Sequence, residues 1–169
     1  MTKKRKVDSF YKPLSVESIH LSEFLRLALK SLVMLVDPQN NTVFITDDPT
    51  IFNPAMKKLR DKYARYFPVL KNSPFSQKGV IPTSKEWYEA IQLLIMSGAL
   101  VPLRMCRAIR WFEDSERVTN ENLRKLFSKN KELRPIFDKF VSDLKCLVVR
   151  SPITGRHPSV FKPIKQARK

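Results

Sequence analysis

Residues 133–149, LRPIFDKFVSDLKCLVV, show most clearly which fold class this chain belongs to. Their apolar side chains recur at intervals of three and four, which is the spacing of one face of an α-helix. Pro135 must lie in a first turn, because proline lacks the N–H that later turns require. We therefore expect a helix that begins between residues 132 and 135 and buries one apolar face. That face consists of Leu133, Phe137, Phe140, Val141, Leu144 and Val148.

Two more segments are rich in apolar residues. Residues 21–36 are mostly Leu, Val and Phe, and Ser22 can cap a helix there. Residues 83–86 fit a capping box for a second helix, and Gly98 is expected to end it. Because residues 84–97 are apolar nearly all round, we expect this helix to be the central one.

Three further helices are expected from start and stop signals. Asn53 and Pro54 form a capping residue followed by a first-position proline, and Pro68 ends that helix. Pro102 is expected to open a helix to about residue 113. Thr119 is expected to cap a short helix to about residue 128.

The segment at residues 32–46 admits two interpretations. A turn at residues 37–41 separates two runs of strand composition, which favours a helix followed by a β-hairpin. The alternative is one long helix followed by a lone strand. We predict a mainly α fold, a compact bundle of about five helices with a small β-hairpin and flexible basic termini. The expected organisation is a basic arm (1–12), a helical core domain (13–149) and a basic tail (150–169).

The charge of the chain is strongly positive and concentrated at its ends. The 169 residues include 32 Lys and Arg against 16 Asp and Glu, a net charge of +16. Residues 1–12 carry +4 of this and residues 150–169 carry +6. Arms of this kind suit a polyanion or a transport receptor. The longest uncharged run, residues 90–103, is too short for a membrane span, which needs about 20 residues.

The N-terminal run Lys3, Lys4, Arg5, Lys6 and Val7 resembles the short nuclear-import signal of the polyomavirus large T antigen type, without the proline that precedes the signal there. The resemblance implies an import receptor as partner and a location in the nucleus as well as the cytoplasm. Short basic runs are common, so contact with nucleic acid and a purely solvated terminus remain as alternatives.

The core contains two basic segments that are candidate nucleic-acid-binding sites, one at residues 104–110 and one at residues 57–66. Arg104, Arg107 and Arg110 would share one side of the expected helix after Pro102, with Trp111 beside them, and could contact successive phosphates. The alternative is an exposed face paired with nearby acids. The tail adds cations among prolines and Phe161, which can order on a polyanion. The remaining candidates are Lys57, Lys58, Arg60, Arg150, Arg156, Lys162, Lys165, Arg168 and Lys169.

Motifs for catalysis or metal binding are absent from the sequence. Cys106 and Cys146 are forty residues apart, which fits neither a disulfide framework nor a zinc site, and both are expected in the core. Tyr63 and Tyr66 share an apolar stripe and are expected to be buried or half-buried rather than base-stacking. We expect no cofactor, no metal and no enzyme activity.

These patterns predict a nuclear-targeted protein that binds RNA or DNA through phosphates, without reading sequence. By analogy alone, a compact, basic, tailed protein also suits a viral structural or nucleoprotein component. The alternative is an interaction protein that assembles with its own copies into a homo-oligomer, or binds a host partner, and uses its N-terminus only for import. The apolar surplus at residues 21–36 and 84–97 motivates this second reading.

Overall fold

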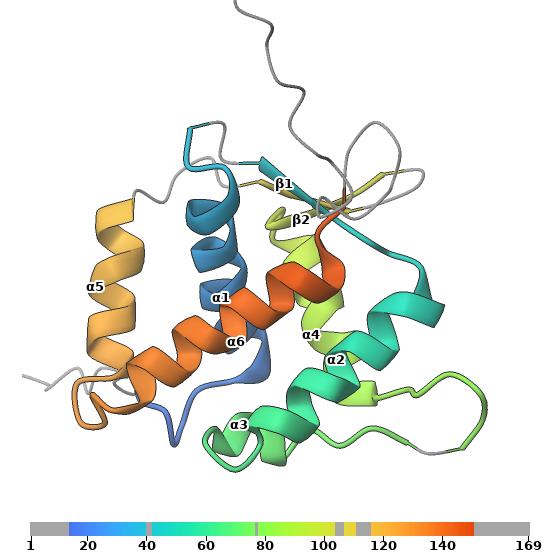
Figure 1. The fold of residues 1–169 in the computed structure, drawn as a ribbon, viewed down its shortest axis with the longest axis horizontal. Coiled ribbons are helices and arrows are strands. Elements are labelled where there is room, and N and C mark those ends of the chain that lie inside the picture. The colour runs from blue at the N-terminus through green and yellow to red at the C-terminus, as the bar shows by residue number, and fades with distance from the viewer. Residues whose placement is uncertain (1–13, 40–41, 77, 104–106, 111–115, 151–169) are drawn as a thin grey trace, which may run out of the picture.

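A computed structural model describes residues 14–150, apart from residues 40–41, 77, 104–106 and 111–115 (Figure 1). The described part is mainly helical, which confirms the predicted fold class. Its elements are α1 (Leu21–Val36), β1 (Thr42–Ile45), α2 (Pro49–Tyr63), α3 (Pro68–Lys71), α4 (Lys85–Met96), β2 (Leu100–Pro102), β3 (Arg107–Arg110), α5 (Glu116–Leu126) and α6 (Leu133–Val148).

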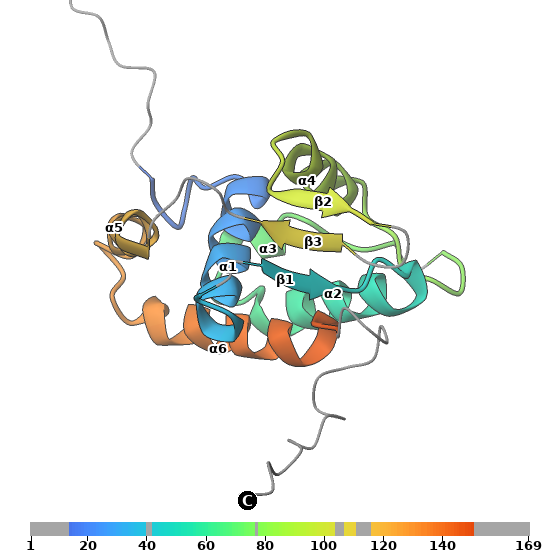
Figure 2. The ribbon, with the colours of Figure 1, turned by 90° about the horizontal axis from the view of Figure 1, so that it is seen from above.

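The central helix is α1, and α4 lies at one edge of the body (Figure 2). α1 packs against α4 on one side and α6 on another, and also contacts α5 and β1. Leu27, Ala28 and Leu32 of α1 are fully buried. The expectation that the helix at 84–97 is central was wrong, because α4 buries only one side. Its exposed side also carries apolar residues, so the sequence is apolar nearly all round although only one side of the helix is buried.

An aromatic cluster joins α1, α2 and α6. The ring of Phe24 lies 5.1 Å from that of Phe67 and 5.4 Å from the rings of Phe137 and Phe140. Tyr63 lies 5.3 Å from Phe140 in an edge-on arrangement. Such edge-on pairs stabilise a core beyond the burial of their area. The predicted inward face of α6 is therefore confirmed, and it meets α2 as well as α1.

α2 begins earlier than expected. The carboxylate of Asp48 accepts hydrogen bonds from the backbone N–H of Thr50 (2.9 Å) and from its hydroxyl (2.6 Å), and Pro49 is the first helical residue. Pro54, expected to open the helix, lies inside it. The cap therefore forms at Asp48 and Pro49, five residues before the Asn53–Pro54 pair that was expected to provide it.

The ends of α4 follow the sequence signals in part. Ser84 precedes the helix, but its hydroxyl donates to the Glu86 carboxylate (3.0 Å) and not to a backbone group, so the expected capping box is not formed. Gly98 ends the helix as predicted, with φ at +76°, a conformation that residues with a side chain rarely adopt.

The strands correct two predictions. α1 runs unbroken to Val36, so the hairpin expected within residues 32–46 does not form. β1 instead pairs antiparallel with β3, and β3 with β2, in the order β1-β3-β2. The helix expected from Pro102 was also wrong, because residues 107–110 form the middle strand. One partner of β3, the strand β2, lies just before it in the chain, but the other, β1, lies some sixty residues earlier, and no local pattern reveals that pairing.

α5 and α6 are the last two helices of the described residues. α5 begins at Glu116, before the expected cap Thr119, which is buried within the helix. α6 begins where it was predicted. Beyond α6 the chain adds to β1: the Thr46 N–H donates to Val148 O (2.9 Å), and the Arg150 N–H donates to Phe44 O (2.8 Å).

Candidate nucleic-acid interface

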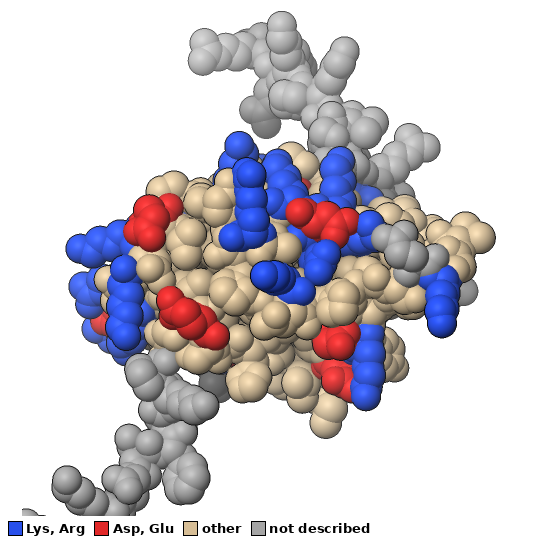
Figure 3. Space-filling view, turned by 90° about the horizontal axis from the view of Figure 1, so that it is seen from below, with Lys and Arg blue, Asp and Glu red and all other residues tan. Residues whose placement is uncertain are grey.

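Most of the surplus positive charge of the described body lies on the surface formed by α2, α3 and α6, called here the α2–α6 surface. α2 and α6 pack side by side and run in opposite directions (Figure 1). In Figure 3, Lys and Arg gather over these helices and outnumber the acids among them. Within residues 49–71 and 133–148, nine cations stand against Asp61, Asp138 and Asp143. The nine cations are Lys57, Lys58, Arg60, Lys62, Arg65, Lys71, Arg134, Lys139 and Lys145.

Asp143 fastens α6 to α2. Its carboxylate accepts hydrogen bonds from Lys62 Nζ (2.6 Å) and from the Tyr63 hydroxyl (2.7 Å). Partial burial works to raise the pKa of Asp143, but these two hydrogen bonds, with the nearby charges of Lys62 and Lys139, outweigh it and hold the pKa below its ordinary value. Asp143 therefore stays ionised and neutralises part of the positive charge where α2 and α6 meet.

Lys57 and Arg60, two of the predicted phosphate contacts, already have partners within α2 and α3. Lys57 and Arg60 pair with Asp61 at 2.7 Å and 3.0 Å. The Arg60 guanidinium also donates to Leu70 O (3.2 Å) and Lys71 O (3.1 Å), the last carbonyls of α3. Arg60 thus holds α3 in place, and its charge is only partly open to a ligand.

Other cations of the α2–α6 surface are more open to solvent. Lys58 is exposed and makes no ion pair with any residue that the structure describes. Lys71 and Lys139 are exposed too, and Arg65 lies over the Tyr66 ring at 4.5 Å. Lysines and arginines held apart on a rigid surface suit the phosphates of a nucleic-acid backbone, and nothing in this arrangement reads base edges.

The sequence did not single out Lys139 and Lys145 of α6, because only the packing of α6 on α2 brings them to this surface. Their one local sign is that they occupy polar positions of the amphipathic helix. The prediction for the tyrosines is confirmed: Tyr63 is buried and Tyr66 half-buried, so neither ring is a free platform for a base.

The predicted arginine face after Pro102 is corrected. Arg107 and Arg110 are the ends of strand β3, so the helical spacing that would align the three arginines is absent. Arg104 and Trp111 lie outside the described residues. So do the import-signal candidates Lys3, Lys4, Arg5 and Lys6 and the tail candidates Arg156, Lys162, Lys165, Arg168 and Lys169.

Arg150, expected as the first cation of the tail, belongs to the body. Its backbone pairs with β1, its guanidinium donates to Val149 O (2.9 Å), and its side chain is half-buried. Burial lowers the pKa of Arg150 from its ordinary value. A ligand could reach this charge only in part.

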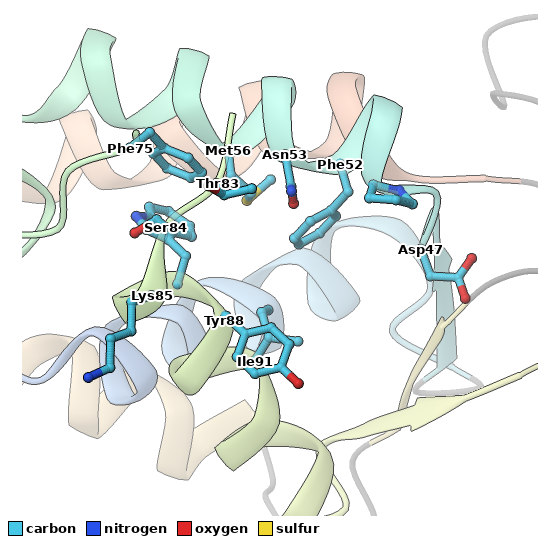
Figure 4. Close-up of a pocket in the computed structure, with 12 residues that line it drawn as sticks. Asp47, Phe52, Asn53, Met56, Phe75, Thr83, Ser84, Lys85, Tyr88 and Ile91 are labelled. Carbon is cyan, nitrogen blue, oxygen red and sulfur yellow. The ribbon is translucent and has the colours of Figure 1, made fainter. Parts of the chain in front are cut away.

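A groove lies between α2 and α4. Its volume is about 480 Å³, and Figure 4 shows residues of both helices pointing into it. Asp47 and Lys85 lie at opposite ends, and they are the only charged residues of its lining. The rest of the lining is apolar or uncharged: Pro49, Phe52, Asn53, Met56, Phe75, Thr83, Ser84, Trp87, Tyr88 and Ile91.

The floor of this groove is built for rigidity. The Trp87 indole N–H donates to Ser73 O (3.2 Å), and its ring lies 5.5 Å from that of Phe75. Tyr88 stands at the rim with 66% of its surface exposed. Two opposite charges so far apart do not form an acid–base pair, so the groove offers shape and apolar contact.

The remaining candidates find no support as sites. Cys146 is an exposed free thiol, so its expected place in the core was wrong, and Cys106 lies outside the described residues. Among the described residues, no three His, Cys, Asp or Glu side chains are placed to hold a metal ion. None of the described helices is long and apolar enough to cross a membrane.

Comparison of the chain with protein-family models, with curated proteins and with solved structures finds no match.

Proposed function

We propose that this protein binds nucleic acid through the phosphate backbone, without sequence specificity, and that its N-terminal basic run directs it to the nucleus. The observation that carries the proposal is the placement of nine cations against three acids on the α2–α6 surface of a chain with net charge +16. Each phosphate that a Lys or Arg neutralises releases condensed counterions, which drives binding at low salt. Residues 1–12 and 150–169, with net charges of +4 and +6, offer the same chemistry.

The α2–α6 surface suits this role because most of its cations come from helices fixed by the aromatic cluster. A rigid array of charges loses little entropy when it meets a polyanion, whereas solvated lysines on loops lose more. The internal pairs of Lys57, Lys62 and Arg60 lower the local surplus but leave Lys58, Lys71 and Lys139 open.

The test measures affinity of the full chain for single-stranded RNA and duplex DNA as a function of salt. We expect log affinity to fall linearly with log salt, with a slope set by the number of phosphates contacted. Lys58→Glu should weaken binding several-fold and lower the slope by about one or more. Lys85→Glu, the same change on exposed α4, is the matched control and should have a smaller effect. Absence of binding at low salt, or an affinity indifferent to salt, would refute the proposal.

The import role is tested separately. Replacing Lys4 and Arg5 by Ala in the full chain fused to a fluorescent protein should shift it from nucleus to cytoplasm, while Lys58→Ala should not. An unchanged distribution would exclude the N-terminal run as the import signal.

One observation favours a second candidate function, the interaction protein. α4 lies at the edge of the body opposite α6 (Figure 2), and it exposes the large apolar side chains of Tyr88, Leu93 and Met96.

A further inference from the structure

The groove between α2 and α4 is aromatic along much of its length. Phe52 and Trp87 belong to its lining and are buried, while Tyr88 stands at its rim. Its volume of about 480 Å³ lies within the range of sites that hold a small ligand or an anchoring side chain. Aromatic-lined grooves of this kind bind proline-containing segments in an extended conformation.

The two charged residues of the lining differ in whether they are already paired. Lys85 Nζ lies 3.7 Å from the Glu89 carboxylate, one turn along α4. Asp47, at the opposite end of the groove, makes no ion pair with any residue that the structure describes. The groove therefore favours an occupant that combines an apolar side chain with a cation near the Asp47 end.

The C-terminal residues of this chain, 151–169, have that composition. They carry five Lys and Arg and no acid. Phe161 is their one Phe, Tyr or Trp, and Lys162 follows it directly. Pro158 and Pro163 flank the pair and favour an extended backbone there.

The described chain ends close to the groove. The Arg150 N–H donates to Phe44 O (2.8 Å), and the Thr46 N–H donates to Val148 O (2.9 Å). Asp47, at one end of the groove, directly follows Thr46 in the sequence. The residues after Arg150 therefore start within a few residues of the groove.

The length of the C-terminal segment is sufficient to reach the groove. Residues 148–150 run antiparallel to β1, so the chain leaves Arg150 in the direction away from Asp47 and must turn back. Gly155 offers a residue suited to that turn. Phe161 comes eleven residues after Arg150, and eleven extended residues span at most about 40 Å. The α2 wall from Pro49 to Met56 is only about 11 Å long.

We propose that residues 158–164 bind in the groove of their own chain, with the Phe161 ring between α2 and α4 and the Lys162 ammonium at Asp47. The ten residues that join Phe161 to Arg150 hold it at an effective concentration on the order of 1 mM, so a weak contact is enough.

The bound segment would bring further cations to α2. This helix forms one wall of the groove and also part of the α2–α6 surface, so Lys165, Arg168 and Lys169 would continue that surface. This consequence rests on the proposed binding of nucleic acid. The contact in the groove does not, so each proposal can fail alone.

NMR of the methyl-labelled full chain tests which segment lies in the groove. It records the methyl groups of Met56 and Ile91, two residues of the lining. Phe161→Ala should shift these resonances, because a ring beside them is lost. Phe10→Ala, the same change in the N-terminal segment, is the matched control and should leave them in place. Unchanged resonances in Phe161→Ala, or equal shifts in the two variants, would overturn the proposal.

Trypsin cleavage after Lys165 tests the same contact from the groove. Asn53 points into the groove (Figure 4), so Asn53→Trp should fill it and raise the cleavage rate at least about threefold. Ile51→Trp, on a residue of α2 that is 40% exposed and outside the lining, is the matched control and should not. Circular dichroism confirms that both variants are folded.

Phe161→Ala gives the same readout without any change to the folded body, and it should raise the cleavage rate by a similar factor. A rate that neither Asn53→Trp nor Phe161→Ala changes would overturn the proposal. Protection from trypsin that grows with protein concentration would assign the groove to the C-terminal segment of a second copy, and would equally overturn binding within one chain.

Discussion

The α2–α6 surface and the outer face of α4 are built on the same core yet present opposite chemistry to solvent. α4 and α6 each pack against α1, and α2 packs against α6. α2 and α6 turn lysines and arginines outward and bind each other through Asp143, while α4 turns Tyr88 and Met96 outward. The comparison shows that a helix's buried side fixes the fold, and its outer side is free to define a partner.

The largest expected effect comes from removing the support beneath the α2–α6 surface. Phe140→Ala deletes a ring that contacts Phe24 (5.4 Å) and Tyr63 (5.3 Å), and should lower the free energy of unfolding by about 3–5 kcal/mol. Leu93→Ala on the exposed face of α4 should cost less than about 1 kcal/mol. Urea denaturation measures both. Similar losses would mean that the outer face of α4 is as closely packed as the aromatic cluster.

The next largest effect concerns α1, the helix against which both α6 and α4 pack. Lys30 of α1 is buried, and burial, with a smaller contribution from Arg26, lowers its pKa from 10.5 to about 8. Above pH 8 the Lys30 ammonium loses its proton in the folded chain but keeps it in the unfolded chain. The free energy of unfolding should therefore rise between pH 8 and about 10, by no more than about 3 kcal/mol.

Denaturant titrations across this pH range measure the effect of Lys30, with Lys30→Met as the comparison. The variant should lose the rise. An equal rise in both proteins would assign it to another group, and a flat profile in the unchanged protein would show that Lys30 titrates as it does in water.

A smaller effect concerns the contact between α2 and α6 at Asp143. Tyr63→Phe removes the hydroxyl that donates to Asp143, and should cost about 1–2 kcal/mol near neutral pH. The pKa of Asp143 is lowered in the folded state, so the stability it contributes is present above its unfolded pKa and is lost as pH falls.

The difference between Tyr63→Phe and the unchanged protein should therefore shrink in acid, as measured by thermal unfolding at several pH values. Asp143→Asn should remove the pH dependence of the difference. A cost that stays constant into acid would show that the hydroxyl matters only for packing.

The smallest effect concerns the C-terminal end of α4, where Gly98 ends the helix. Gly98→Ala should cost about 1 kcal/mol, because an added Cβ meets no atom within 4 Å and the whole penalty is that of φ at +76°. Ser97→Ala, one residue earlier with φ at −78°, is the control and should change the unfolding free energy by less than about 0.5 kcal/mol. Equal costs would point to a lost contact of the serine rather than to backbone strain.

The sequence predicted those parts of the fold that depend on local periodicity. α6 was predicted with its start because its apolar residues repeat with the helix and Pro135 marks its first turn. α1 was predicted only in part: its apolar pattern indicated a helix, but the expected cap Ser22 lies inside it and the expected hairpin would have ended it near residue 32. The segment after Pro102 also fits threes and fours, yet it is held as a strand between β2, just before it, and β1, far away in the chain. Strand pairing of this kind is decided by tertiary contact, which single-chain patterns do not contain.

The candidate site was predicted less completely than the fold. The charge of α2 was visible in Lys57, Lys58 and Arg60, but the partners that engage two of them were not. Asp61 lies beside them in sequence, whereas the α3 carbonyls reach Arg60 only through folding. Lys139 joins the surface for the same reason, since α6 follows α2 by some seventy residues.

Two backbone hydrogen bonds tie residues 148–150 to β1. Thr46 and Phe44 each use a main-chain group to hold residues 148–150, so a truncation placed where the cationic segment starts would strip an edge from the sheet. Shortened proteins meant to isolate the role of the tail should retain Arg150 and its neighbours. A cut before Val148 would confuse loss of a ligand with loss of structure.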